Sequence, residues 1–188
     1  MTSEKADLRA QLRLRRRELA LTHLHAAERA ALHLPLERLG RVMVAAGYHA
    51  IGGELDPWPA LRRLSEAGAR IALPVAVSPH APLRFHLFEP GDVLEPDASR
   101  TPAPLPSAPL VTPDLLLMPL LGFDRRGYRL GQGGGYYDRT LQALRGAGPV
   151  WAVGLAYAGQ ALDAVPHDGH DQPLDAILTE TGYHVVQA

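Results

Sequence analysis

The feature that most constrains the fold is an apolar run that leads through a glycine-rich loop into a helical pattern. Leu115 to Met118 form a continuous apolar run, typical of a strand buried on both faces, and Pro119 closes it. Residues 131–135 contain four glycines, and helical spacing resumes at Tyr136. The last glycines are therefore predicted at a helix N-terminus, where backbone N–H groups and the helix dipole favour an anion such as phosphate.

This loop matches neither standard phosphate-binding motif. It lacks the Gly-Lys-Ser/Thr ending of a P-loop, and the third glycine of a dinucleotide fingerprint would fall on Tyr136. One interpretation is a flexible surface loop that only links the strand to the helix. The neighbouring residues favour a binding site instead, because linker composition does not explain them. These neighbours are Arg125, Arg126, Arg129, Tyr136, Tyr137, Asp138 and Arg139.

Composition limits the class of protein. The chain has 188 residues, 46% of them hydrophobic and 21% charged, which suits a single domain over residues 1–188. A net charge of −1 gives no global field that would attract nucleic acid or a membrane. Cysteine is absent, so zinc cannot be bound through thiolates. With no signal-peptide pattern and no membrane-spanning apolar run, we expect a cytoplasmic protein.

The N-terminal segment is predicted to be helical. Ser3 is expected to cap a helix through residues 8–21, and a second helix is expected over residues 22–39, capped by Thr22 and interrupted near Pro35. Lys5 and Arg9 lie four residues apart, so both project from one side of the first helix and can reach one anion. The alternative is a basic face that only contacts water.

The rest of the chain alternates strands with helices. Strands are expected at residues 41–48, 71–75, 83–88, 115–118, 150–155 and 177–179. The first two flank a helix marked by Asp56 and Gly68, which predicts a parallel β-α-β unit. The third is expected to be antiparallel, and the proline-rich residues 89–113 are expected to form an extended covering loop. Glu54 lies where ligands bind in open α/β sheets, although a solvent-facing glutamate is the commoner case.

A short loop near the C-terminus concentrates groups that bind metals. Grouped carboxylates can hold Mg²⁺ together with water or phosphate oxygens. Two histidines would instead suggest a transition metal, but a third clear ligand is lacking. A cluster that only forms turns is the remaining alternative. The residues are Asp163, His167, Asp168, His170, Asp171 and Asp175.

The glycine-rich region as a whole resembles the signature of the 5-formyltetrahydrofolate cyclo-ligase family, also called 5,10-methenyltetrahydrofolate synthetase. The resemblance rests on Gly122-Phe123-Asp124, Gly127 and the run Arg129-Leu130-Gly131-Gln132-Gly133-Gly134-Gly135-Tyr136-Tyr137-Asp138-Arg139. Weaker matches follow in the family's order along nearly the whole chain. They include Lys5, Leu8-Arg9, Glu54, Leu73-Pro74, Glu95-Pro96, Val165-Pro166 and His170-Asp171.

The resemblance implies an enzyme that uses ATP and Mg²⁺ to convert 5-formyltetrahydrofolate into 5,10-methenyltetrahydrofolate, ADP and phosphate. The formyl oxygen would be phosphorylated, and N10 would then attack the activated carbon. It also implies a three-layer α/β/α fold with a mainly parallel central sheet, similar to sugar-phosphate isomerases, preceded by N-terminal helices. We expect a monomer that accepts folate with or without a polyglutamate tail.

The resemblance also implies roles for individual residues. Arg129 and Tyr136 would be catalytic, and Asp138 and Asp171 would organise Mg²⁺. Folate would contact Glu54, His49 and Tyr136. ATP would be bound by Lys5, Arg9, Arg129, Leu130, Gly131, Gln132, Gly133, Gly134, Gly135, Tyr136 and Tyr137.

Two positions depart from the family pattern. Gly134 stands where some relatives have a lysine, so Arg125, Arg129 or Arg139 would have to balance the phosphate charge. Pro57 stands in a segment where many relatives carry a hydroxyl residue.

Two other functions remain open from the sequence. A sugar-phosphate isomerase of similar architecture would need a carboxylate base but no nucleotide. A folate- or nucleotide-binding regulatory module would bind without turnover.

Overall fold

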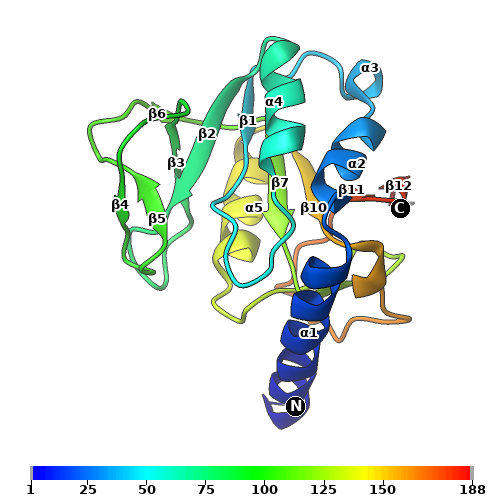
Figure 1. Cartoon of the computed structure of the whole chain (residues 1–188). Helices are drawn as coiled ribbons and strands as arrows, with labels where there is room; N and C mark the ends of the chain where they lie inside the picture. The colour runs from blue at the N-terminus through cyan, green and yellow to red at the C-terminus, as the bar shows by residue number, and fades with distance from the viewer. Residues whose placement is uncertain (1, 187–188) are drawn as a thin grey trace.

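The computed structural model describes residues 2–186, and its centre is an eight-stranded sheet (Figure 1). Five neighbouring strands, from β11 to β2, pair in parallel, while the strands at the two edges pair antiparallel. The predicted mainly parallel sheet is therefore confirmed. Its spatial order is β12 (Gly182–Val185), β11 (Ala176–Thr179), β10 (Trp151–Leu155), β7 (Leu115–Pro119), β1 (Val44–Ala46), β2 (Arg70–Val75), β3 (Arg84–Leu87) and β6 (Leu110–Val111).

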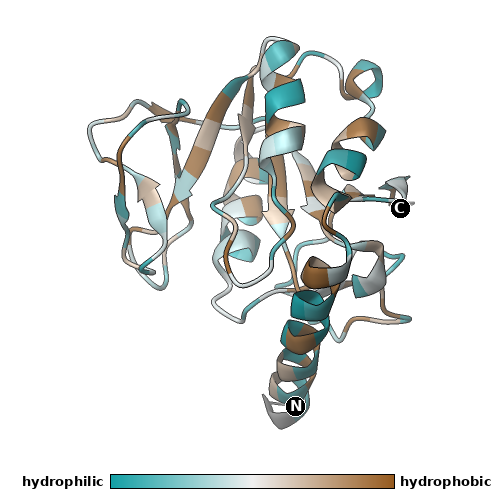
Figure 2. Cartoon of the chain, in the orientation of Figure 1, coloured by the Kyte–Doolittle hydropathy of each residue, from teal (hydrophilic) through white to brown (hydrophobic). Residues whose placement is uncertain are grey.

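Strand β7 lies in the middle of this sheet and is buried on both faces. Leu115 and Leu117 pack into the hydrophobic core on one side, whereas Leu116 and Met118 pack into the core on the other. Successive side chains of a strand point to opposite faces, so an unbroken apolar run is what two covered faces require. Figure 2 shows hydrophobic residues along the central strands and hydrophilic residues on the outer side of α4.

Helices cover both faces of the sheet. Helices α2 and α4 pack on the face of Leu115, and α5 packs on the other face through Leu141. Gly47 follows β1, and a Cβ atom there would collide with Leu61 Cδ1 of α4, so any larger residue would displace that side chain. The helices are α1 (Thr2–Thr22), α2 (Ala26–His33), α3 (Leu36–Leu39), α4 (Trp58–Glu66) and α5 (Tyr136–Ala147), with a short 3₁₀ turn η1 (Ala158–Gln160).

The predicted limits of α4 were correct to within one residue, since Pro57 and not Asp56 is its N-cap, and the limits around α1 were wrong. Asp56 Oδ1 accepts a hydrogen bond from the Trp58 N–H at 3.0 Å, as expected at a helix start. Ser3 lies inside α1, which begins at Thr2. Thr22 is the last residue of α1, and its hydroxyl donates to the Glu18 carbonyl at 2.9 Å instead of capping a second helix.

Several short strands were not predicted from the sequence. The proline-rich residues 89–113, predicted as one covering loop, contain a hairpin of β4 (Leu94–Pro96) and β5 (Pro102–Pro104), followed by β6 at the sheet edge. A second hairpin, β8 (Gly122–Phe123) with β9 (Arg129–Leu130), lies between β7 and the glycine loop, and β12 was also missed. Strands this short carry no periodicity in the sequence, and edge strands tolerate proline. Only their pairing with neighbouring strands identifies them.

The tip of the β4–β5 hairpin is tied to the end of β2. Asp97 Oδ1 accepts the backbone N–H groups of Ser99 and Thr101, which closes the turn. Its Oδ2 accepts the Ala76 N–H at 2.7 Å. One aspartate thus holds the hairpin tip beside the carboxyl end of the sheet.

Within residues 2–186, no helix combines the length and the apolar character that crossing a membrane would need.

Asp124 joins the β8–β9 hairpin to the segment that follows η1. Its side chain is fully buried and accepts the N–H groups of Arg126, Tyr128 and Val165. Burial alone acts to raise the pKa of this carboxyl. The Val165 N–H, the Arg126 side chain and the other N–H groups outweigh burial, so the pKa lies below its ordinary value.

We expect Asp124→Asn to lower the free energy of unfolding by about 1–3 kcal/mol at neutral pH, because it weakens several buried hydrogen bonds. The folded-state pKa is lower than the unfolded one, so the ionised carboxylate stabilises the protein above about pH 4 and loses this effect as the pH falls through the folded-state pKa. Urea unfolding at several pH values measures the free energy of unfolding of wild type, of Asp124→Asn and of the control Asp163→Asn, whose side chain is exposed. A difference between wild type and Asp124→Asn that stays constant into acid would contradict the prediction.

Candidate active site

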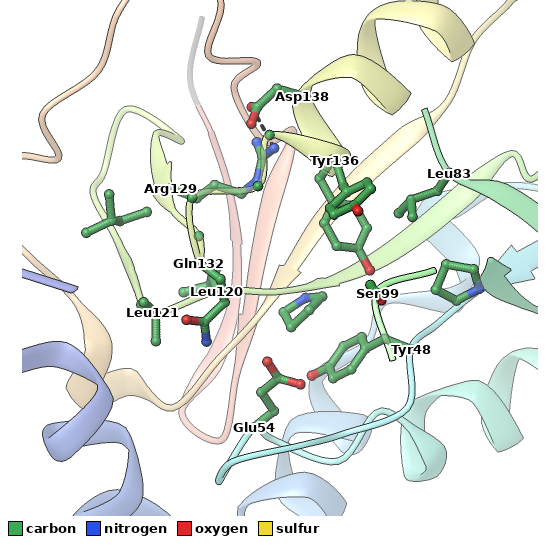
Figure 3. Close-up of a pocket in the computed structure, with 18 of the residues that line it drawn as sticks. Tyr48, Glu54, Leu83, Ser99, Leu120, Leu121, Arg129, Gln132, Tyr136 and Asp138 are labelled. Carbon is green, nitrogen blue, oxygen red and sulfur yellow. Dashed lines mark hydrogen bonds and ion pairs between the residues drawn. The ribbon is translucent and has the colours of Figure 1, made fainter. Parts of the chain in front are cut away.

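A pocket of about 420 Å³ lies at the carboxyl ends of β1, β2 and β7 (Figure 3). This is the edge at which open α/β sheets bind ligands. Its walls come from α1, the segment after β1, the end of β7, the glycine loop with the start of α5, and the tip of the β4–β5 hairpin. Segments distant in the sequence therefore form one cavity.

The glycine loop forms one wall of the pocket and runs directly into α5. Residues 129–138 all line the cavity. Gly133 and Gly135 adopt φ angles of +101° and +64°, which side chains rarely tolerate. Gly135 is the N-cap of α5, so the helix N-terminus faces the pocket as predicted. This arrangement suits an anion, because N–H groups of a helix start have no partners within the helix.

Helix α1 lays basic side chains against that loop. Arg9 Nε donates to the Gly131 carbonyl at 3.0 Å, and Arg13 Nε donates to Gln132 Oε1 at 2.9 Å. Lys5 also lines the pocket, one turn before Arg9. The alternative of a basic face that only contacts water is wrong for these residues.

The acidic loop near the C-terminus meets Lys5. The Lys5 ammonium lies 3.5 Å from Asp168 Oδ2 and 3.8 Å from Asp171 Oδ2. Asp168 Oδ1 also accepts the His170 N–H, which is a turn-forming contact. In the part of the chain that the structure describes, no three His, Cys, Asp or Glu side chains gather to hold a metal. The transition-metal interpretation therefore gains no support from the described residues.

Arg129 and Asp138, predicted as a catalytic residue and a metal ligand, are paired with each other. The Arg129 side chain is 5% exposed, and its Nη2 lies 2.7 Å from Asp138 Oδ1. Its Nη1 donates to the Gln172 carbonyl, and the Gln172 N–H donates to Asp138 Oδ1 at 3.1 Å. Both residues line the pocket, with Arg129 held in a fixed position.

Glu54 and Tyr48 occupy the side of the pocket opposite Arg129 and Asp138 (Figure 3). The Glu54 side chain is 8% exposed, and its Oε2 accepts the Ile51 N–H at 3.1 Å. Burial raises the pKa of this carboxyl, while the Ile51 N–H and a neighbouring arginine oppose the shift. Glu54 is thus a buried pocket carboxylate and not a solvent-facing loop residue.

The two tyrosines at the start of α5 also line the pocket, as does His49. The Arg139 guanidinium lies over the Tyr136 ring, with Arg139 Cζ 5.3 Å from the ring centroid. Burial raises the pKa of Tyr137, and the Glu54 charge adds to this effect. Tyr137 therefore stays protonated at neutral pH and can donate but not act as a base.

The two departures from the family pattern have structural consequences. Of the arginines considered as substitutes for a lysine at Gly134, only Arg129 lines the pocket. Arg139 donates to the Gly134 carbonyl but does not line the pocket, and Arg125 lines a different hollow. Pro57 precedes α4 and does not line the pocket.

Several residues line the pocket although no sequence pattern predicted them there. Tyr48 and the hairpin tip carry no motif, and only tertiary structure brings them in. Arg16 could have been found, because it lies seven residues after Arg9 and shares its side of α1. Gln160 does not line the pocket, but its buried Nε2 donates to the Leu120 carbonyl of the pocket wall at 2.9 Å.

Known proteins resemble this chain over most of its length. The model of the 5-formyltetrahydrofolate cyclo-ligase family matches residues 1–180. The chain belongs to this family. A 5-formyltetrahydrofolate cyclo-ligase of Mycolicibacterium smegmatis is 36% identical over 147 residues, covering 74% of this chain and 74% of the relative. That of Haemophilus influenzae is 31% identical over 193 residues, covering 94% and 98%.

Solved structures agree with the family assignment. The 5,10-methenyltetrahydrofolate synthetase of Aquifex aeolicus superposes with a TM-score of 0.74 at 26% identity, covering 98% of this chain and 93% of that one. The synthetase of Mycoplasma pneumoniae shares the fold, with a TM-score of 0.68 at 24% identity over 94% and 98% of the two chains. The predicted family and its enzyme class are confirmed.

We expect Gly133→Ala to raise the KM for ATP by about ten-fold or more, since its φ of +101° is strained for a side chain and the new Cβ would lie 3.3 Å from Arg9 Cζ. Gly131→Ala is the matched comparison, because its Cβ would meet open space and its φ lies outside the left-handed region. Steady-state kinetics with circular dichroism of both variants measures the difference. Equal KM values for ATP in the two variants would mean that the loop is only a linker.

Proposed function

We propose that this pocket binds ATP and 5-formyltetrahydrofolate together and closes the folate ring to 5,10-methenyltetrahydrofolate, releasing ADP and phosphate. The observation that carries the proposal is the joining, in one cavity, of a glycine loop at a helix N-terminus with the buried carboxylate of Glu54. The first suits a nucleotide's phosphates, and the second suits the N–H groups of a pterin ring. Family membership supplies the reaction that needs both.

The chemistry requires the formyl oxygen to become a leaving group. That oxygen attacks the γ-phosphorus of ATP, the bond to the bridging oxygen breaks, and ADP leaves. The N10 lone pair then bonds to the formyl carbon, N10 loses its proton, and the C–O bond breaks as phosphate departs. Phosphoryl transfer of this kind asks the protein mainly for positioning and charge neutralisation.

The nucleotide would lie along the glycine loop. Lys5 and Arg9 would contact its phosphates, and residues 129–137 would surround them. Lys5 now faces Asp168 and Asp171, so an arriving phosphate would replace carboxylates as its partner. These cations of α1, together with Arg129, supply the charge that a lysine at position 134 provides in some relatives.

Magnesium would be held by Asp138 and Asp171. Both line the pocket, and their side chains are 27% and 28% exposed, so both are accessible to an ion that arrives with ATP. Two carboxylates suit an ion that keeps water and phosphate oxygens as its other partners. Such an ion would neutralise phosphate charge.

The folate would occupy the opposite side. Glu54 would accept hydrogen bonds from the pterin ring, with His49 beside it. Tyr136 would pack against the reacting part of the substrate. Arg129 and Tyr136 would act at the formyl group and the transferred phosphoryl group.

Two alternatives make different predictions. A regulatory module would bind both ligands without turnover, and a sugar-phosphate isomerase would act without ATP. Likeness to the sugar-phosphate isomerase fold stays a prediction from the sequence. The single domain, the monomeric state, the cytoplasmic location and the use of polyglutamylated folate also stay predictions.

The deciding experiment is a spectrophotometric assay. Purified protein is mixed with 5-formyltetrahydrofolate, Mg²⁺ and ATP, and absorbance is followed in the methenyl-folate band beside a control without ATP. Growth of the band that requires ATP supports ring closure. Binding of ATP and folate without growth would favour the regulatory module, and growth without ATP would contradict the proposed mechanism.

We expect Arg129→Ala to weaken ATP binding by about ten-fold or more, because it removes a cation from the pocket wall beside the glycine loop. Arg125→Ala is the control, since Arg125 is exposed and lies outside this pocket. Calorimetric titration with MgATP compares the two, and thermal unfolding checks that both are folded. An unchanged dissociation constant for folded Arg129→Ala would remove Arg129 from the nucleotide site.

A further inference from the structure

Arg16 is a buried arginine of the pocket wall to which the proposed function gives no role. It lies on α1, on the side that carries Lys5 and Arg9, and it lines the cavity. Its side chain is only 4% exposed. Arginine is almost never this buried unless it is paired, because an unpaired buried charge is costly. The partners of Arg16 therefore indicate what it does.

The Arg16 guanidinium links α1 to two other segments of the pocket wall, the loop after β1 and the end of β7. Nη1 lies 3.1 Å from Glu54 Oε1 and donates to the Leu120 carbonyl at the end of β7 at 3.3 Å. Nη2 donates to the carbonyls of Gly52 at 3.2 Å and Ile51 at 3.5 Å. Nε is buried without a hydrogen-bond partner within the described structure. The planar fork of arginine makes this set of contacts, which a lysine cannot reproduce.

These contacts fix both oxygens of Glu54. Oε1 is held by Arg16 and Oε2 by the Ile51 N–H. Gly53, in the same loop, has a φ of +81° and approaches α1 so closely that a Cβ atom would lie 3.4 Å from Arg17 Cα. Both carboxylate oxygens therefore have a fixed partner, and Glu54 lines the cavity.

Arg16 also favours the ionised form of Glu54. Burial raises the pKa of Glu54, and the Ile51 N–H, Arg16 and, more weakly, His49 lower it. Tyr48 and Tyr137 face the same carboxylate as neutral phenols whose pKa values are raised by burial. Without Arg16, the low-polarity surroundings would favour the protonated acid, which is a poorer acceptor.

We propose that Arg16 is a positioning residue for folate: it holds Glu54 ionised and in one orientation, so that this carboxylate accepts hydrogen bonds from the N–H groups of the pterin ring. The inference rests on the proposed function, because it requires folate in this pocket. Arg16 acts through Glu54, so its removal changes folate binding and leaves ATP binding largely intact.

The test compares Arg16→Met and Arg16→Lys with the matched controls Arg15→Met and Arg15→Lys. Arg15 is the preceding residue of the same helix and is exposed. We expect Arg16→Met to raise the folate KM by about ten-fold or more while the ATP KM changes less than about two-fold. Arg16→Lys keeps the charge but loses the fork, so its folate KM should rise by a smaller factor.

The pH profile separates positioning from a purely structural role. In Arg16→Met the pKa of Glu54 rises, so the acidic limb of kcat/KM for folate should move to higher pH. Arg16→Lys should leave that limb near its wild-type position. A merely structural residue would affect both substrates equally and would not move the limb.

A double-mutant cycle shows whether Arg16 acts through Glu54. Glu54→Gln should raise the folate KM by itself, and adding Arg16→Met should raise it little further. Fully additive effects would mean that Arg16 affects folate by another route and would overturn the inference.

The remaining outcomes each decide a separate question. Absence of ring closure in the wild type overturns the proposed function and this inference with it. An active wild type, with the folate KM of folded Arg16→Met equal to that of Arg15→Met, overturns this inference alone. If Arg16→Met does not fold, Arg16→Lys decides, and a folate KM equal to that of Arg15→Lys overturns the inference.

Discussion

The burial of β7 on both faces is the constraint on which the rest of the structure depends. Leu115 to Met118 alternate between two hydrophobic cores, so helices must cover both sides of the sheet. A strand enclosed in this way can meet solvent and ligands only at its ends. The chain leaves β7 at Pro119, and the pocket begins there. The site therefore forms where the buried strand stops.

Charge is arranged so that the pocket is balanced before any ligand arrives. Lys5 faces two aspartates, Arg16 faces Glu54, and Arg129 faces Asp138. Paired groups avoid the cost of isolated charges in a partly enclosed cavity. The phosphates of ATP would compete for partners at one wall, whereas the buried pair at the other wall keeps its geometry. Helix α1 contributes lining residues to both walls from a single face. Figure 1 shows that this helix extends beyond the sheet.

Much of this arrangement was predictable where the sequence carries a strong local pattern. The run of β7, the limits of α4 and the entry of the glycine loop into α5 follow from apolar periodicity and from residues with special backbone preferences. The hairpins β4–β5 and β8–β9 were not predictable, because two or three residues hold no period. The predicted capping role of Thr22 was wrong for a related reason. A threonine hydroxyl can donate to a preceding carbonyl of its own helix as readily as it caps the next helix.

The sequence by itself determined the mainly parallel sheet, the glycine loop that opens α5 and the family, because the patterns behind them lie in residues close together in the chain. Only the tertiary structure decided which side chains meet across the pocket. Arg129 pairs with Asp138 nine residues later, but Arg16 pairs with Glu54 and Lys5 with Asp168 across much longer separations. The strength of such ion pairs depends on distance and burial, and both are set by the packing of α1 against the sheet edge. No local pattern contains that information.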